Sequence, residues 1–124
     1  MKTKALHYYN QGYNCSQCVL KALEDKYKVN IPKQSYAMCS AVSNGFGVGG
    51  MCSVLIAGIM AFGVLFDEQT AKRLRIKLLS RFQETHKSNS CESLKMERRS
   101  GRKCEVLVAD IAELIDEIIE EEEV

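Results

Sequence analysis

The feature that most constrains the fold is an apolar segment, residues 51–66, which contains no charged side chain. Its 16 residues fall short of the roughly 20 that a membrane-spanning helix needs, so we expect no membrane span. A glycine-rich stretch (residues 45–50) precedes the segment, and Gly58 and Gly63 interrupt it, so other groups can approach its backbone closely. The sequence therefore predicts a buried, central apolar helix near residues 51–66.

The rest of the chain shows helical periodicity. Asn14 and Gln17 form a capping-box pair that predicts a helix starting at Cys15. Residues 104–118 carry apolar side chains at helical spacing. A basic segment earlier in the chain, which begins at Asp67 or Thr70, shows the same spacing. The apolar positions of that preceding helix are Ala71, Leu74, Ile76, Leu78, Leu79 and Phe82. No segment alternates with period two. We therefore expect an all-α, compact bundle of about five to six helices, forming a single domain over residues 1–124.

Charge and composition exclude several function classes. The formal net charge of +1 implies no general attraction to nucleic acid or to a membrane surface. The N-terminal segment has two lysines but no apolar stretch after them, so it is not a secretory signal, and a cytoplasmic location is expected. In a reducing compartment, cysteines more often bind metals or carry redox chemistry than form structural disulfides. The six cysteines are therefore the candidate functional residues.

Four of the six cysteines are predicted in or beside the first turn of a helix: Cys15, Cys52, Cys91 and Cys104. Free N–H groups and the positive end of the helix dipole stabilise a thiolate or an anionic cluster at such positions. Several thiolates repel one another unless backbone donors, a metal ion or the iron of an iron–sulfur cluster lies between them. Cys39 lies on an apolar face and is interpreted as a small core residue, whereas Cys18 is either a core residue or a partner of Cys15.

Two other functions stay open at this point. Cys15 and Cys18 form a C-x-x-C motif at a helix start, which indicates a thiol/disulfide oxidoreductase using Cys15 with Cys18 or Cys52 and no cofactor. The third functional hypothesis is a helical interaction module with structural cysteines. His7 and His86 lack metal-ligand spacing, and no Ser/His/Asp constellation stands out.

The cysteines and their surroundings resemble a known family. Asn14-Cys15-Ser16-Gln17, the glycines before Cys52, the small-residue helix with Met60 and Gly63, and then Cys91 and Cys104 resemble the redox-active C-GCAxxG-C-C proteins of bacteria and archaea. The resemblance covers nearly the whole chain and implies redox activity at the four helix-start cysteines. A related domain in split-Soret cytochromes holds an iron–sulfur cluster through cysteines. The resemblance therefore makes an iron–sulfur cluster the leading cofactor and electron transfer the leading function.

Charge patterning suggests contacts with other proteins. Residues 67–103 hold eleven Lys/Arg and five Asp/Glu, which indicates a solvated basic face or a docking surface for an acidic redox partner. The acidic end, residues 120–123, is expected to fray or to pair with this basic face in the same or a second molecule. If the protein forms a homodimer, we expect the two copies to meet through an apolar or methionine-bearing face.

Overall fold

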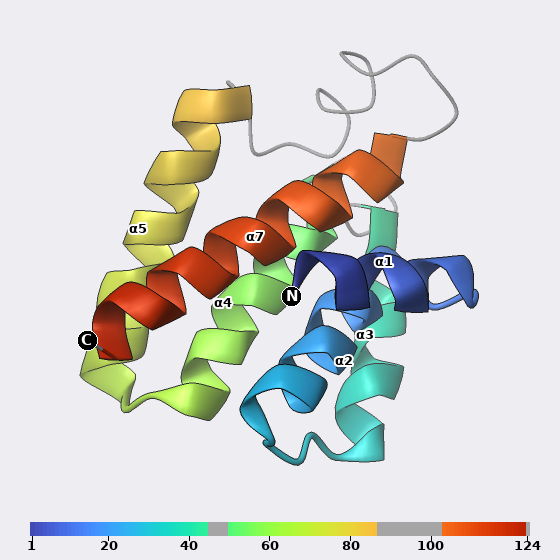
Figure 1. Cartoon of the computed structure of the whole chain (residues 1–124), viewed down its shortest axis with the longest axis horizontal. Helices are drawn as coiled ribbons and strands as arrows, with labels where there is room; N and C mark the ends of the chain where they lie inside the picture. Colours follow the sequence, from blue (N-terminus) through green and yellow to red (C-terminus); the bar gives the residue numbers. More distant parts are fainter. Residues whose placement is uncertain (45–49, 87–102, 124) are drawn as a thin grey trace.

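The computed structural model describes residues 1–44, 50–86 and 103–123, and this part of the chain forms six helices and no strand (Figure 1). The all-α bundle expected from the sequence is confirmed. The helices are α1 (Lys2–Asn10), α2 (Cys15–Tyr27), α3 (Lys33–Asn44), α4 (Ser53–Leu65), α5 (Glu68–His86) and α7 (Lys103–Glu123).

The start of α2 follows from local side-chain chemistry. The Asn14 side chain accepts a hydrogen bond from the Gln17 backbone N–H at 2.9 Å, and the Gln17 side chain accepts one from the Asn14 N–H at 3.1 Å. This is the predicted capping box, and it places Cys15 at the first helical position. The helix ends where Lys28 adopts the left-handed conformation, with φ of 58°.

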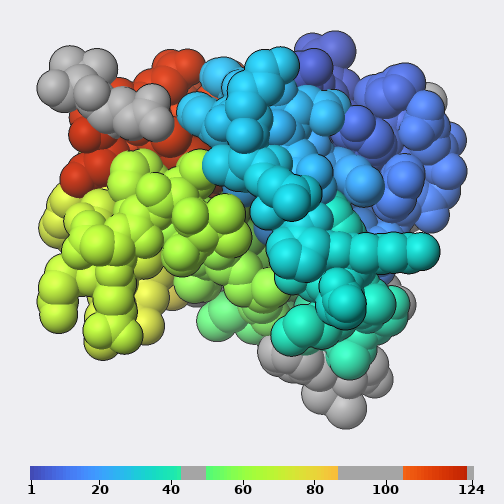
Figure 2. Space-filling model, turned by 90° about the horizontal axis from the view of Figure 1, so that it is seen from below, coloured from blue at the N-terminus to red at the C-terminus, as the bar shows by residue number. Residues whose placement is uncertain are grey.

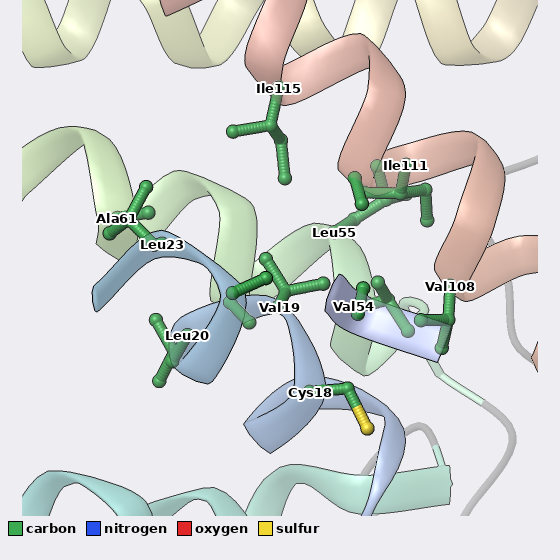
Figure 3. Packing of buried hydrophobic residues seen from close by; sticks show 14 of the residues in the cluster. Cys18, Val19, Leu20, Leu23, Val54, Leu55, Ala61, Val108, Ile111 and Ile115 are labelled. Carbon is green, nitrogen blue, oxygen red and sulfur yellow. The ribbon is translucent and has the colours of Figure 1, made fainter. Parts of the chain in front are cut away.

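Helix α4 lies at the centre of the bundle, as the apolar segment predicted. It packs against α2, α3, α5 and α7, and most of its side chains are buried. Figure 3 shows Leu55 of α4 in the core close to Ile111 of α7, with Val19 and Leu23 of α2 nearby. No helix in the described residues is both long enough and apolar enough to cross a membrane.

One apolar residue of α5 was placed wrongly by its sequence pattern. Leu74, Leu78 and Phe82 are fully buried, but Ile76 is 57 % exposed. Each helical residue turns by about 100°, so Ile76 lies roughly opposite the face that Leu74 and Leu78 present to the core.

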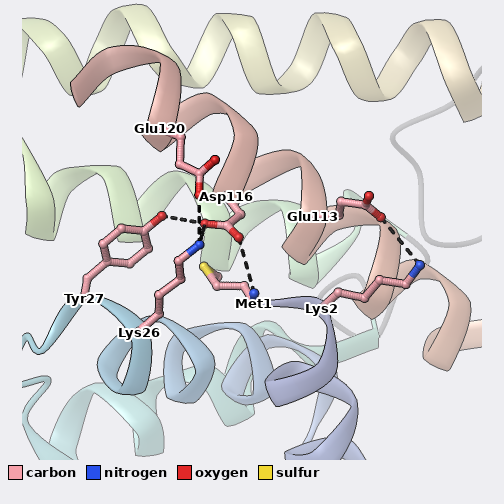
Figure 4. A network of polar contacts seen from close by, with 7 residues as sticks. All are labelled: Met1, Lys2, Lys26, Tyr27, Glu113, Asp116 and Glu120. Carbon is pink, nitrogen blue, oxygen red and sulfur yellow. Dashed lines mark hydrogen bonds and ion pairs between the residues drawn. The ribbon is translucent and has the colours of Figure 1, made fainter. Parts of the chain in front are cut away.

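A polar network fastens α7 to the first two helices (Figure 4). The Asp116 carboxylate accepts hydrogen bonds from the N-terminal amine of Met1 at 3.3 Å, from the Tyr27 hydroxyl at 2.5 Å and from Lys26. Burial opposes ionisation of this carboxylate, but hydrogen bonds from Lys26 and Tyr27 outweigh it and hold the pKa of Asp116 below its ordinary value. The network therefore fixes α7 across the ends of α1 and α2.

The acidic end of α7 pairs with the basic face of α5 in the same molecule. Arg81 donates two hydrogen bonds to Glu121, at 2.8 and 3.0 Å, and Lys77 lies 2.8 Å from the same carboxylate. Arg73 pairs with Glu122. These contacts explain why α7 continues to Glu123 where the sequence suggested fraying, and they occupy basic side chains that an acidic partner could otherwise use.

Candidate functional site

The starts of α2 and α4 meet at a sulfur–oxygen contact. Cys15 is the first residue of α2, and its Sγ lies 3.2 Å from the Oγ of Ser53, the first residue of α4. Cys52 is the N-cap residue of α4, directly before Ser53. Ser53 and Cys52 are buried, with exposed fractions of 2 % and 4 %, whereas Cys15 is partly exposed. The contact therefore brings two of the predicted site cysteines, Cys15 and Cys52, into one neighbourhood.

The two helix starts differ in how their backbone is capped. The Asn14 side chain caps α2, but the Cys52 side chain makes no capping hydrogen bond to α4. The Cys52 carbonyl accepts hydrogen bonds from the backbone N–H groups of Leu55 and Ile56, at 3.1 and 3.3 Å. The positive end of the α4 dipole is thus left without a side-chain cap from its N-cap residue, which favours an anionic sulfur nearby.

Cys18 and Cys39 are buried thiols beside this site. The Cys18 Sγ donates to the Tyr13 carbonyl at 3.6 Å, and the Cys39 Sγ donates to the Ser35 carbonyl at 3.4 Å. Burial raises the pKa of Cys18 to about 12, and proximity to Cys15 adds to the shift. Burial also raises the pKa of Cys39, although a hydrogen bond with Ser16 partly opposes it. Both side chains are therefore protonated at neutral pH, which agrees with a core role for Cys39.

Side-chain and capping contacts hold α3 close to the start of α2. The Gln17 side chain, which completes the capping box, also donates through Nε2 to the Tyr36 carbonyl of α3 at 2.9 Å. Ser16 is completely buried and donates to the Asn14 side chain at 2.8 Å. Gln17, which helps to start α2, thus also positions the helix that carries Cys39.

The remaining two predicted cysteines are described only in part. Cys104 is the second residue of α7, so its backbone is at a helix start as expected, but its side chain lies outside the described part of the chain, as does all of Cys91. The helices that begin at Cys15, near Cys52 and near Cys104 all run from right to left in Figure 1. Val19, Val54 and Val108, from the first two turns of these helices, lie in the same region of the core in Figure 3. Among the side chains that are described, no three from His, Cys, Asp and Glu form a group that could hold a metal.

Sequence reasoning missed the contribution of Ser53. The available signal was a hydroxyl residue directly after a cysteine, at the start of an otherwise apolar helix. The histidines contact other side chains of the protein, and His7 Nε2 lies 3.0 Å from Gln11 Nε2. His86 is buried, stacks on Phe82 with ring centroids 4.3 Å apart, and lies 3.3 Å from an oxygen of Asp110.

Comparisons with known proteins agree with the order of these cysteines. Searches of curated proteins and of solved structures return no match. A family model does match, and its name writes one cysteine, a GCAxxG segment and two further cysteines. This chain has Cys15, Cys52, Cys91 and Cys104 in that order. Around Cys52 it departs from the pattern, with Met51 and Ile56 where the pattern places glycine and Ser53 where it places alanine. Because this match spans residues 13–118, the chain belongs to the family described as "Putative redox-active protein (C_GCAxxG_C_C)".

Proposed function

We propose that this protein transfers electrons through an iron–sulfur cluster or other metal held by Cys15, Cys52, Cys91 and Cys104. The observation that carries the proposal is the 3.2 Å contact between the Cys15 Sγ and the Ser53 Oγ, because it joins the two helix starts that bear Cys15 and Cys52. When bound, the metal group would supply the one-electron chemistry that thiols alone do not provide.

The donor chemistry of the described cysteines supports this assignment. Metal ligation requires thiolates, and positions at helix starts stabilise negative charge on sulfur. Cys15 and Cys52 occupy such positions. Cys18 and Cys39 are less suited as ligands, because burial raises the pKa of each and their thiols donate to backbone carbonyls. Among the four described cysteines, these contacts favour Cys15 and Cys52 over Cys18 and Cys39 as ligands.

Ser53 has a positioning role in this proposal. Its hydroxyl is buried against the Cys15 sulfur, where it can donate a hydrogen bond once that sulfur carries negative charge. Hydrogen bonds to ligand sulfurs stabilise the more negative, reduced state and so raise the reduction potential of a cluster. We expect Ser53→Ala to keep the metal content of the protein but to lower its reduction potential, measured by redox titration.

Anaerobic purification followed by iron and acid-labile sulfide analysis tests the proposal. Wild-type protein, as isolated or after reconstitution, should contain iron and sulfide, and Cys15→Ser and Cys52→Ser should each lose most of both. Cys39→Ala is the matched control, since it removes a nearby cysteine that the proposal does not use, and it should keep the wild-type content. A protein that binds no metal under reconstitution, or a Cys15→Ser variant with full metal content, would overturn the proposal.

Thiol/disulfide oxidoreduction through a Cys15–Cys52 disulfide is the second candidate function. It is favoured by the contact between Cys15 and Ser53, which brings the two helix starts together. Oxidised glutathione would accept the two electrons released as two thiols lose their protons and form one S–S bond. Cys18 is a poor attacking group for this reaction because burial raises its pKa to about 12. Peptide mass spectrometry of metal-free, oxidised protein should find the Cys15–Cys52 link if this function holds, and no link at these residues if it does not.

A further inference from the structure

A pocket at the far end of α4 has no role in the proposed cysteine site. Its volume is about 310 Å³, and it lies between the last turn of α4 and the first turns of α5. Gly63 and Cys52 are eleven residues apart, which corresponds to about 16 Å along the axis of α4. The end of α4 and the start of α5 form the yellow-green surface in the left foreground of Figure 2.

Gly63 lines this pocket at a position where a side chain would have open space. A Cβ atom built at Gly63 would meet no other atom within 4 Å, and the backbone there is not in the left-handed region. Gly58, in the same helix, is explained by close packing, since a Cβ there would lie 2.7 Å from Ile115 Cδ1. Glycine inside a helix lowers helix stability, and nothing in the described part of this chain requires it at residue 63. The absence of a side chain at residue 63 leaves room for a ligand.

The lining of the pocket combines an apolar floor with positive charge at the rim. Ile59, Phe66 and Ala71 supply apolar surface, and Lys72 and Arg75 supply two cations. Lys72 has only a weak, exposed ion pair with Glu68 at 3.8 Å. Other basic side chains of α5 pair with the acidic end of α7. Among the described residues, no ion pair is found for Arg75.

We infer that this pocket binds a small carboxylate with an apolar body. A volume near 300 Å³ is at the lower end of the range for small-molecule pockets, which suits a short aliphatic or aromatic chain. Glu68, Lys72 and Arg75 together leave one net positive charge, which matches a monoanion, and a guanidinium binds a carboxylate through two parallel hydrogen bonds. The second negative charge of a dianionic phosphate would exceed the one net positive charge of these three side chains.

Calorimetric titration of the full chain with octanoate tests this inference. Octanoate should bind saturably at one site, while octanamide, which lacks the charge, and acetate, which lacks the apolar body, should bind at least tenfold more weakly. Gly63→Leu fills the pocket and should weaken octanoate binding at least tenfold. Arg75→Gln should weaken it about tenfold. Arg73→Gln removes the same charge from another face of α5 and should leave octanoate affinity unchanged.

Several results would overturn the inference. These are no saturable binding of octanoate, equal binding of octanamide, or wild-type affinity in Arg75→Gln. A wild-type dimer that dissociates in Gly63→Leu, without octanoate binding, would instead identify the pocket as a contact between two copies of the chain. Circular dichroism shows whether Gly63→Leu folds, and if it does not, the comparison of Arg75→Gln with Arg73→Gln decides.

Discussion

Gly58 and Gly63 lie in the same helix, but their replacement by alanine should change stability in opposite directions. A Cβ at Gly58 would lie 2.7 Å from Ile115 Cδ1 and 3.0 Å from Leu78 Cδ2, and both of those side chains are fully buried. A Cβ at Gly63 would have no neighbour within 4 Å. The same chemical change therefore tests a tightly packed position and an open one.

The magnitudes follow from two competing contributions. Alanine is favoured over glycine in a helix by about 1 kcal/mol, less near a helix end, so Gly63→Ala should stabilise the fold by about 0.5–1 kcal/mol. At Gly58 the same gain is opposed by overpacking, which costs about 1–3 kcal/mol in a close-packed core. Gly58→Ala should therefore destabilise the protein by about 1 kcal/mol. For a chain of 124 residues, 1 kcal/mol shifts Tm by about 4 °C.

Urea unfolding followed by circular dichroism measures both variants. A third variant, Ile115→Val, removes the Cδ1 atom that the new methyl group at residue 58 would meet. Gly58→Ala should then cost less in the Ile115→Val background than in the wild type, which a double-mutant cycle detects. Equal stabilisation by the two alanines, or a cycle with no coupling between residues 58 and 115, would refute the packing argument.

Three further predictions concern capping, ionisation and thiol reactivity. Asn14→Ala should lower stability by about 1 kcal/mol in thermal unfolding, whereas Asn14→Asp, which keeps the capping oxygen, should stay near wild type. Asp116→Asn should cost about 1–3 kcal/mol at pH 7 in urea unfolding. The folded pKa of Asp116 is depressed, so the wild type's advantage is present above the unfolded pKa of about 4 and should disappear as pH falls through the folded value. Iodoacetamide at pH 8 should label Cys15 in the folded protein but Cys18 only after denaturation, as read by peptide mass spectrometry; equal labelling in the fold would contradict the burial of Cys18.

Much of the fold could be predicted because it depends on neighbours in the sequence. The capping box of Asn14 and Gln17 involves residues three apart, so it specified the start of α2 before any tertiary contact was considered. The uncharged run at residues 51–66 is apolar on all sides, which predicted a buried central helix. Helix α4 is central, but Met60 and Val64 near its end are 37 % and 50 % exposed. The placement of Cys15 and Cys52 at helix starts followed from these two local signals.

The candidate site was only partly predictable, because it depends on how separate helices meet. The contact of Cys15 with Ser53 joins residues 38 positions apart, and no local pattern specifies which helix faces which. The burial of Cys18 and Cys39 beside Cys15 is likewise set by how α3 packs on α2. The sequence could name Cys15 and Cys52 as candidate ligands and Cys39 as a core residue, but it left the role of Cys18 open.

The sequence by itself thus determined the described helices, their apolar segments and the backbone positions of Cys15, Cys52 and Cys104, since hydrogen bonds and periodicity within a few residues decide these. The tertiary structure alone decided that Ile76 faces outward, that the acidic end of α7 pairs with α5, and that Gly58 is packed while Gly63 is open. Those outcomes depend on the rotation and spacing of whole helices, which are set by the shapes of the surfaces that meet in the core.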